Sequence, residues 1–162
     1  MKNILVVIDM QNDFIRGSLK AFDGESIIPG IIAEISKRKS NDVLFTKDTH
    51  HKDYLNTNEG KHLPVIHCIE NTQGWELVAE IKNLTRDSLI IKKPTFGSLI
   101  LIDELKKRIK SKEDIITLVG VCSDICVISN AVLIKTYFRE NNVIVLKDCV
   151  RGVTEEKNIE AL

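Results

Sequence analysis

Apolar positions along the chain follow two alternating patterns. Continuous apolar runs, rich in β-branched residues, occupy residues 3–9, 42–48, 88–93, 114–121 and 142–148. Runs of this kind are typical of strands that are buried on both faces of a parallel sheet. Helical spacing appears in residues 27–39, 74–81, 98–110 and 124–139 and again from residue 154, whereas residues 49–74 look irregular. The alternation predicts an α/β fold, a three-layer α/β/α Rossmann-like domain around a mainly parallel sheet.

Composition narrows the class of protein. The chain is 43% hydrophobic, which suits one folded domain spanning residues 1–162, and no linker or repeat divides it. Its formal net charge is zero, so no basic surface indicates a nucleic-acid or membrane partner. The apolar start is too short and ends too soon in Asp9 to be a signal peptide. Four cysteines without a paired spacing indicate reduced thiols and a cytoplasmic protein, and a homo-oligomer stays open.

Chemically active side chains follow four of the predicted strands. The first strand ends at Asp9, the second at Asp48 and the third at Lys93, while the fourth runs toward Cys126. In open α/β sheets, sites lie at the carboxyl ends of the strands. One polar residue there means little, but four of complementary types predict an active site.

Cys126 lies in "VCSDICV" (121–127), where the fourth strand turns into a helix. Ser123 is a suitable N-cap, which places Cys126 in the first helical turn, where free N–H groups and the helix dipole favour a thiolate. A nucleophile with an acidic thiol is one interpretation, and a small buried hydrophobic residue is the other. Cys122 is better explained as a packed residue at the turn, although a redox pair with Cys126 stays open.

Asp9 and Lys93 supply what a cysteine nucleophile needs. No histidine ends a strand beside Cys126, so Asp9 is the candidate proton acceptor. Lys93 would hold the carboxylate ionised and stabilise negative charge that develops during the reaction. The alternatives are a capping carboxylate and a solvated lysine.

The irregular segment and the strand before it carry metal-type ligands. Asp48 and His50 lie in "TKDTHH" (46–51), and His67 lies in "LPVIHCIE" (63–70). One carboxylate and two imidazoles suit one divalent transition metal, Zn before Fe or Mn, with coordination positions left for water or substrate. Glu59 is either a partner of these ligands or an ordinary loop carboxylate.

Six segments together resemble the isochorismatase-like cysteine hydrolases, and within them the nicotinamidase and pyrazinamidase branch. They occur in the family's order and span nearly the whole chain: "VVIDMQNDF" (6–14), "TKDTH" (46–50), "LPVIHCIENTQGWEL" (63–77), "KPTFGSL" (93–99), "GVCSDICV" (120–127) and "DCVRGVTEEKNIEAL" (148–162).

The resemblance implies a catalytic triad of Asp9, Lys93 and Cys126 and an oxyanion hole from the backbone N–H groups of Cys122 and Cys126. It also implies a cis peptide between Val121 and Cys122. Phe14 matches an aromatic residue that packs against the substrate, and the metal is expected on Asp48, His50 and His67.

The family's sheet has six strands in the order 3-2-1-4-5-6, which implies that the strands ending in Asp9, Lys93 and Cys126 lie side by side. The family also continues past the last helix, so a chain shortened after Leu162 is an expectation.

The expected activity is hydrolysis of a small amide C–N bond through a thioester, with nicotinamide the leading substrate. Two departures remove aromatic walls found in nicotinamidases: Pro64 replaces a tryptophan, and only "PTFGS" follows Lys93. Another small amide or a ureido compound is therefore an alternative substrate. A thiol redox or metal-sensing protein and a catalytically silent binding module are the alternatives from other classes.

Overall fold

A five-stranded parallel sheet forms the centre of the computed structural model, which describes residues 1–162. The strands have the order β3-β2-β1-β4-β5. Their bounds are Asn3–Ile8 for β1, Val43–Asp48 for β2, Leu89–Lys93 for β3, Ile115–Val121 for β4 and Asn142–Arg151 for β5. All four strand pairings are parallel, as the continuous apolar runs predict.

The predicted sixth strand is absent. The residues after β5 form the helix α7 (Glu155–Ala161), so none of the 162 residues supplies a sixth strand. The expectation of six strands came from the family resemblance, whereas the apolar runs themselves number five. The order of these five strands agrees with the prediction.

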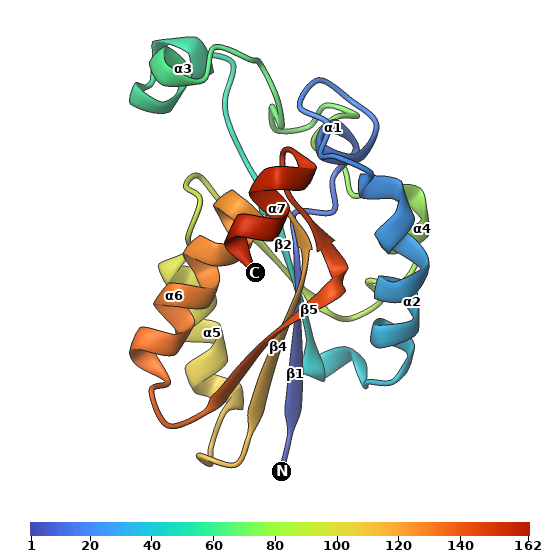
Figure 1. The fold of residues 1–162 in the computed structure, drawn as a ribbon, viewed down its shortest axis with the longest axis vertical. Helices are drawn as coiled ribbons and strands as arrows, with labels where there is room; N and C mark the ends of the chain where they lie inside the picture. Colours follow the sequence, from blue (N-terminus) through green and yellow to red (C-terminus); the bar gives the residue numbers. More distant parts are fainter.

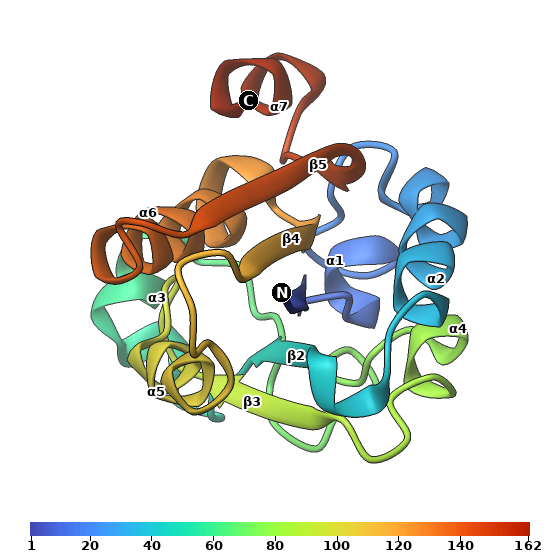
Figure 2. The same cartoon turned by 90° about the horizontal axis from the view of Figure 1, so that it is seen from below.

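Helices cover both faces of the sheet (Figures 1 and 2). One face carries α5 (Leu99–Arg108) and α6 (Ile128–Tyr137), and the other carries α2 (Ile28–Ser36) and α4 (Ala79–Lys82), with α1 (Asn12–Ile15) nearby. The short helix α3 (Asn58–His62) lies in the segment expected to be irregular. No helix is both long and apolar enough to cross a membrane.

The central strand β1 explains how two cores form. Leu5 and Val7 belong to the core beneath α2, whereas Ile4 and Val6 belong to the core beneath α5 and α6. Successive side chains of a strand point to opposite faces, so a strand that is apolar at every position feeds both layers.

Three helices differ from their predicted bounds by more than two residues at one end. The first ends at Ser36 rather than at residue 39. Residues 74–78, expected to be helical, instead pair with the segment after β1: the N–H groups of Asn12 and Asp13 donate to the carbonyls of Glu76 and Gly74. Since those carbonyls are already used, the helix begins only at residue 79. The third begins with a π-helical turn, Ser123–Val127, before α6.

Gly120 brings the ends of β1 and β4 together. It has φ of +114°, and a Cβ atom there would lie 2.1 Å from the carbonyl oxygen of Ile8. Only glycine accepts both the backbone conformation and this close approach. The peptide between Val121 and Cys122, one residue farther on, is cis, as the resemblance implied.

Candidate active site

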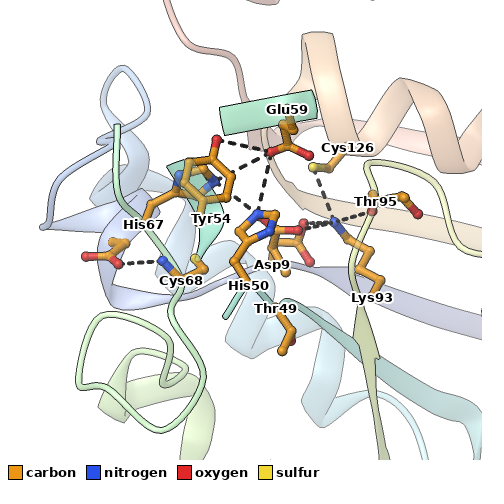
Figure 3. A network of polar contacts seen from close by, with 12 residues as sticks. Asp9, Thr49, His50, Tyr54, Glu59, His67, Cys68, Lys93, Thr95 and Cys126 are labelled. Carbon is orange, nitrogen blue, oxygen red and sulfur yellow. Dashed lines mark hydrogen bonds and ion pairs between the residues drawn. The ribbon is translucent and has the colours of Figure 1, made fainter. Parts of the chain in front are cut away.

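The four predicted side chains meet at the carboxyl edge of the sheet. Asp9 follows β1, Asp48 and Lys93 end β2 and β3, and Cys126 lies in the π-helical turn after β4. Figure 3 shows Lys93 pointing toward both Asp9 and Cys126. One expectation needs correction: β2 lies between β1 and β3, so the strands that end in Asp9 and Lys93 are not neighbours. The long lysine side chain spans that distance.

Lys93 is the charged centre of the site. Its Nζ lies 2.6 Å from Asp9 Oδ2 and 3.5 Å from Asp48 Oδ1. It also lies 3.4 Å from Cys126 Sγ and donates to the carbonyl of Thr95 at 3.2 Å. Burial of this side chain, which is 0% exposed, opposes the charged form. Asp9 and the other negative groups outweigh that effect and raise the pKa of Lys93 above its ordinary value, so the ammonium ion persists.

Asp9 is a buried carboxylate with a partner on each oxygen. It is fully buried, its backbone has φ of +49°, and its Oδ1 accepts a hydrogen bond from Thr46 Oγ1 at 2.6 Å. Lys93 is the sole partner of Oδ2. Burial raises the pKa of Asp9, and the attraction of Lys93 only partly opposes this. A carboxyl group with a raised pKa takes up a proton more readily than an exposed aspartate does.

Cys126 is a buried thiol beside the ammonium group, and burial raises its pKa well above the ordinary value despite the nearby positive charge of Lys93. Burial therefore opposes the acidic thiol expected from the sequence, because the sequence signals of a helix start say nothing about desolvation. The predicted cap is wrong, since Ser123 Oγ donates to Asn158 Oδ1 at 2.7 Å instead.

Cys122 contributes its backbone to the site. Its N–H group donates to no other group of the protein, as an oxyanion hole requires, and the assignment of that hole to Cys122 and Cys126 stays a prediction. Burial raises the pKa of the Cys122 thiol to about 12. All four cysteines are free.

Asp48, His50 and His67 form the predicted metal cluster. Their ligand atoms all lie within 4.8 Å of one another, and Asp48 Oδ2 lies 3.0 Å from His50 Nε2 and 3.4 Å from His67 Nε2. His67 Nδ1 lies 2.7 Å from the carbonyl of Val65, so a proton on Nδ1 leaves Nε2 free as a ligand. This arrangement of the outer hydrogen bond is usual for metal-binding histidines. The three residues thus fit a divalent metal.

Two further groups surround the cluster. Glu59 Oε1 lies 3.5 Å from His50 Nε2 and 4.0 Å from His67 Nε2. The hydroxyl of Tyr54 donates to the Leu63 carbonyl at 2.9 Å, and its ring packs against both imidazoles. Glu59 is therefore a partner of the ligands and not an ordinary loop carboxylate.

Hydrogen bonds and ionic attraction keep Asp48 ionised. Although burial works in the opposite direction, hydrogen bonds from His50 and His67 and the charge of Lys93 hold the pKa of Asp48 below its usual range. Burial likewise opposes the protonated form of His67, but bonding to Asp48 and to the Val65 carbonyl raises its pKa. An ionised carboxylate is the form that binds a metal ion.

The isochorismatase domain matches residues 3–162. The chain belongs to the isochorismatase family. An uncharacterised isochorismatase family protein, PncA, of Bacillus subtilis (strain 168) is 28% identical over 174 residues, which cover 100% of this chain and 93% of the relative. The predicted family and its hydrolase class are thereby confirmed.

Solved structures share this isochorismatase fold. A nicotinamidase/pyrazinamidase PncA from Bacillus subtilis has a TM-score of 0.85 at 24% identity, with 99% of this chain and 92% of that chain covered. A pyrazinamidase of Pyrococcus horikoshii in complex with zinc has a TM-score of 0.80 at 27% identity, with the same two shares covered.

A cavity of about 190 Å³ reaches the site of this isochorismatase-family chain. Cys126, Asp48 and His67 line it, together with the aromatic residues Phe14 and Phe96. The "PTFGS" segment therefore still supplies an aromatic wall. Contact of Phe14 with a substrate stays a prediction.

Three supporting residues escaped the sequence interpretation. Thr46 bonds Asp9, and Gln11 bonds the backbone of Asp48 through both ends of its amide. Asn130 donates to the carbonyls of Cys126 and Phe96 and so joins the turn that carries Cys126 to the segment after Lys93. Thr46 and Asn130 are polar residues in largely apolar stretches, which was the available signal, since buried polar groups need partners, whereas Gln11 lies among polar residues and gave no such signal.

Proposed function

We propose that residues 1–162 form one cytoplasmic hydrolase domain that cleaves the C–N bond of a small primary amide, with nicotinamide as the first candidate substrate. The observation that carries this proposal is the connected set of Asp9, Lys93 and the Cys126 thiol, of which Cys126 lines a cavity. The solved relatives described as nicotinamidase or pyrazinamidase support it.

In the proposed reaction Asp9 takes the proton of the Cys126 thiol, and the sulfur attacks the amide carbonyl. The backbone N–H groups of Cys122 and Cys126 would hold the oxyanion. Asp9 then protonates the nitrogen as the C–N bond breaks, and ammonia leaves a thioester on Cys126. Water cleaves the thioester, with Asp9 accepting its proton and returning one to the thiol.

Lys93 keeps its charge throughout and stabilises negative charge on Asp9 and on sulfur. Asp48, His50 and His67 would hold one divalent transition metal, with zinc the first choice. When bound, that ion would orient the substrate or bind a pyridine-like nitrogen. No proton transfer in the proposed reaction depends on it.

The test is ammonia release from nicotinamide, with simple amides and a ureido compound as comparators. Cys126→Ala should lose activity by at least about a thousandfold, as in other enzymes that lose a nucleophile. Cys122→Ala is the matched control and should stay within about tenfold of the wild type, because alanine preserves the backbone N–H. Unchanged turnover in Cys126→Ala would overturn the mechanism.

A further inference from the structure

One side chain of the cavity wall has no part in the proposed chemistry. Lys157, on α7, lines the same cavity as Cys126. Figure 1 shows α7 at the carboxyl edge of the sheet, and this helix packs against the turn that carries Cys126. The Lys157 side chain is exposed, and its ammonium group makes no hydrogen bond or ion pair.

The other charged group of the cavity wall is already paired. The Asp48 carboxylate contacts His50, His67 and Lys93. Most remaining wall residues are apolar, among them Leu63, Phe96, Ile125 and Val153. Lys157 therefore contributes the cavity's one unpaired ionic group.

Local contacts fix the backbone of Lys157 relative to the nucleophile. Asn158, the next residue, accepts the hydrogen bond of Ser123, and the N–H of Val153 donates to Asp124 Oδ1 at 2.9 Å. Thr154 caps α7 by accepting from the N–H of Lys157 at 3.2 Å. Only the side chain remains to be ordered when a ligand binds, which limits the entropic cost.

The acidic residues of α7 leave the ammonium group of Lys157 free to bind a ligand. None of Glu155, Glu156 and Glu160 forms an ion pair with Lys157. An exposed cation that lines a mostly apolar cavity complements a ligand with an apolar body and an anionic end.

We propose that Lys157 is a specificity-determining residue that binds an anionic group, a carboxylate, at the end of the substrate opposite its amide. The inference rests on the proposed function and names the class of amide. A volume of about 190 Å³ equals the space of about six liquid waters, so the substrate is small.

The experiment compares kcat/KM for two matched pairs of amides. 5-Carbamoylpyridine-3-carboxylate is paired with 5-acetylnicotinamide, and succinamate with 4-oxopentanamide. In each pair an acetyl group replaces the carboxylate at equal heavy-atom count. The ratio of anionic to neutral substrate is compared between variants, so that differences in intrinsic reactivity cancel.

Lys157→Gln should lower this ratio by about two- to fivefold, within the range of an exposed ion pair, and Lys157→Glu by about tenfold. Lys157→Arg should preserve it. Lys112→Gln is the charge-matched control, because Lys112 is exposed in the loop before β4, at the opposite edge of the sheet. It should leave the ratio unchanged, and salt should weaken the preference of the wild type.

Equal ratios in the wild type and both charge-removing variants would overturn the assignment of Lys157. So would hydrolysis of nicotinamide alone, with neither anionic amide accepted. If the wild type hydrolyses no amide at all, the proposed function itself fails, and turnover of nicotinamide separates the two failures.

Discussion

Replacing Lys93 by methionine tests the electrostatic core of the site most directly. The substitution keeps most of the side-chain length and removes the ammonium group. In the native protein this group is 0% exposed and lies 2.6 Å from one buried carboxylate and 3.5 Å from another. Losing one partner of a buried ion pair leaves an uncompensated charge, which costs about 3–5 kcal/mol of stability.

The loss of stability caused by Lys93→Met should depend on pH. Burial already raises the pKa of Asp9, and Lys93 is the main influence that lowers it, so the variant raises it further. A carboxyl group with a raised folded-state pKa favours the folded state while protonated and disfavours it as pH rises through that pKa. The loss of stability should therefore be larger at about pH 8 than at about pH 5, which lies near the ordinary range of carboxyl groups.

Urea unfolding at both pH values measures the free energy of unfolding of the wild type and the variant. A chelator is present so that no metal compensates for the lost charge. Lys92→Met is the matched control. The Lys92 side chain is 57% exposed and pairs with Glu70, so its replacement should lower the free energy of unfolding by less than about 1 kcal/mol. Adding Asp9→Asn to Lys93→Met should restore part of the stability, since it removes the unpaired carboxylate. Equal, pH-independent costs for the two lysine variants would refute the reasoning.

Three further predictions concern the chemistry. One divalent transition metal should bind per chain, and Asp48→Asn should lose it, as elemental analysis of dialysed protein will show; metal retained in the variant would place the site elsewhere. Asp9→Asn should lower amide turnover by about a hundredfold to ten-thousandfold, the range of a lost general base, and native turnover in an ammonia assay would exclude Asp9 as the proton shuttle. Iodoacetamide should label Cys126 slowly at neutral pH and faster as pH rises, because burial raises the pKa of its thiol; rapid labelling at neutral pH, mapped by mass spectrometry, would show an acidic thiol instead.

The sequence predicted the sheet and its functional edge well because both depend on local patterns. Apolar runs mark buried strands, and the residue that ends a run must reach the sheet edge, so the places of Asp9, Asp48 and Lys93 followed. The π-helical turn and the role of Ser123 did not follow, since Asn158, 35 residues away in the sequence, takes the Ser123 hydroxyl. A serine hydroxyl can bond either to a nearby backbone N–H as a helix cap or to a side chain distant in the sequence, and the sequence does not indicate which bond forms.

Nothing in the sequence indicated that burial raises the pKa of the Cys126 thiol, and this raised pKa affects the mechanism. Burial favours the neutral thiol of Cys126, whereas at Asp9 the attraction of Lys93, 2.6 Å away, opposes the effect of burial and favours the carboxylate form. A preformed thiolate beside an ionised carboxylate would attack readily but would have no proton for the departing nitrogen. A neutral thiol brings that proton with it, and Asp9 can carry it to the leaving group. Desolvation, which a helix-start pattern in the sequence cannot reveal, thus makes the pair suited to cleaving an amide, whose leaving nitrogen requires protonation.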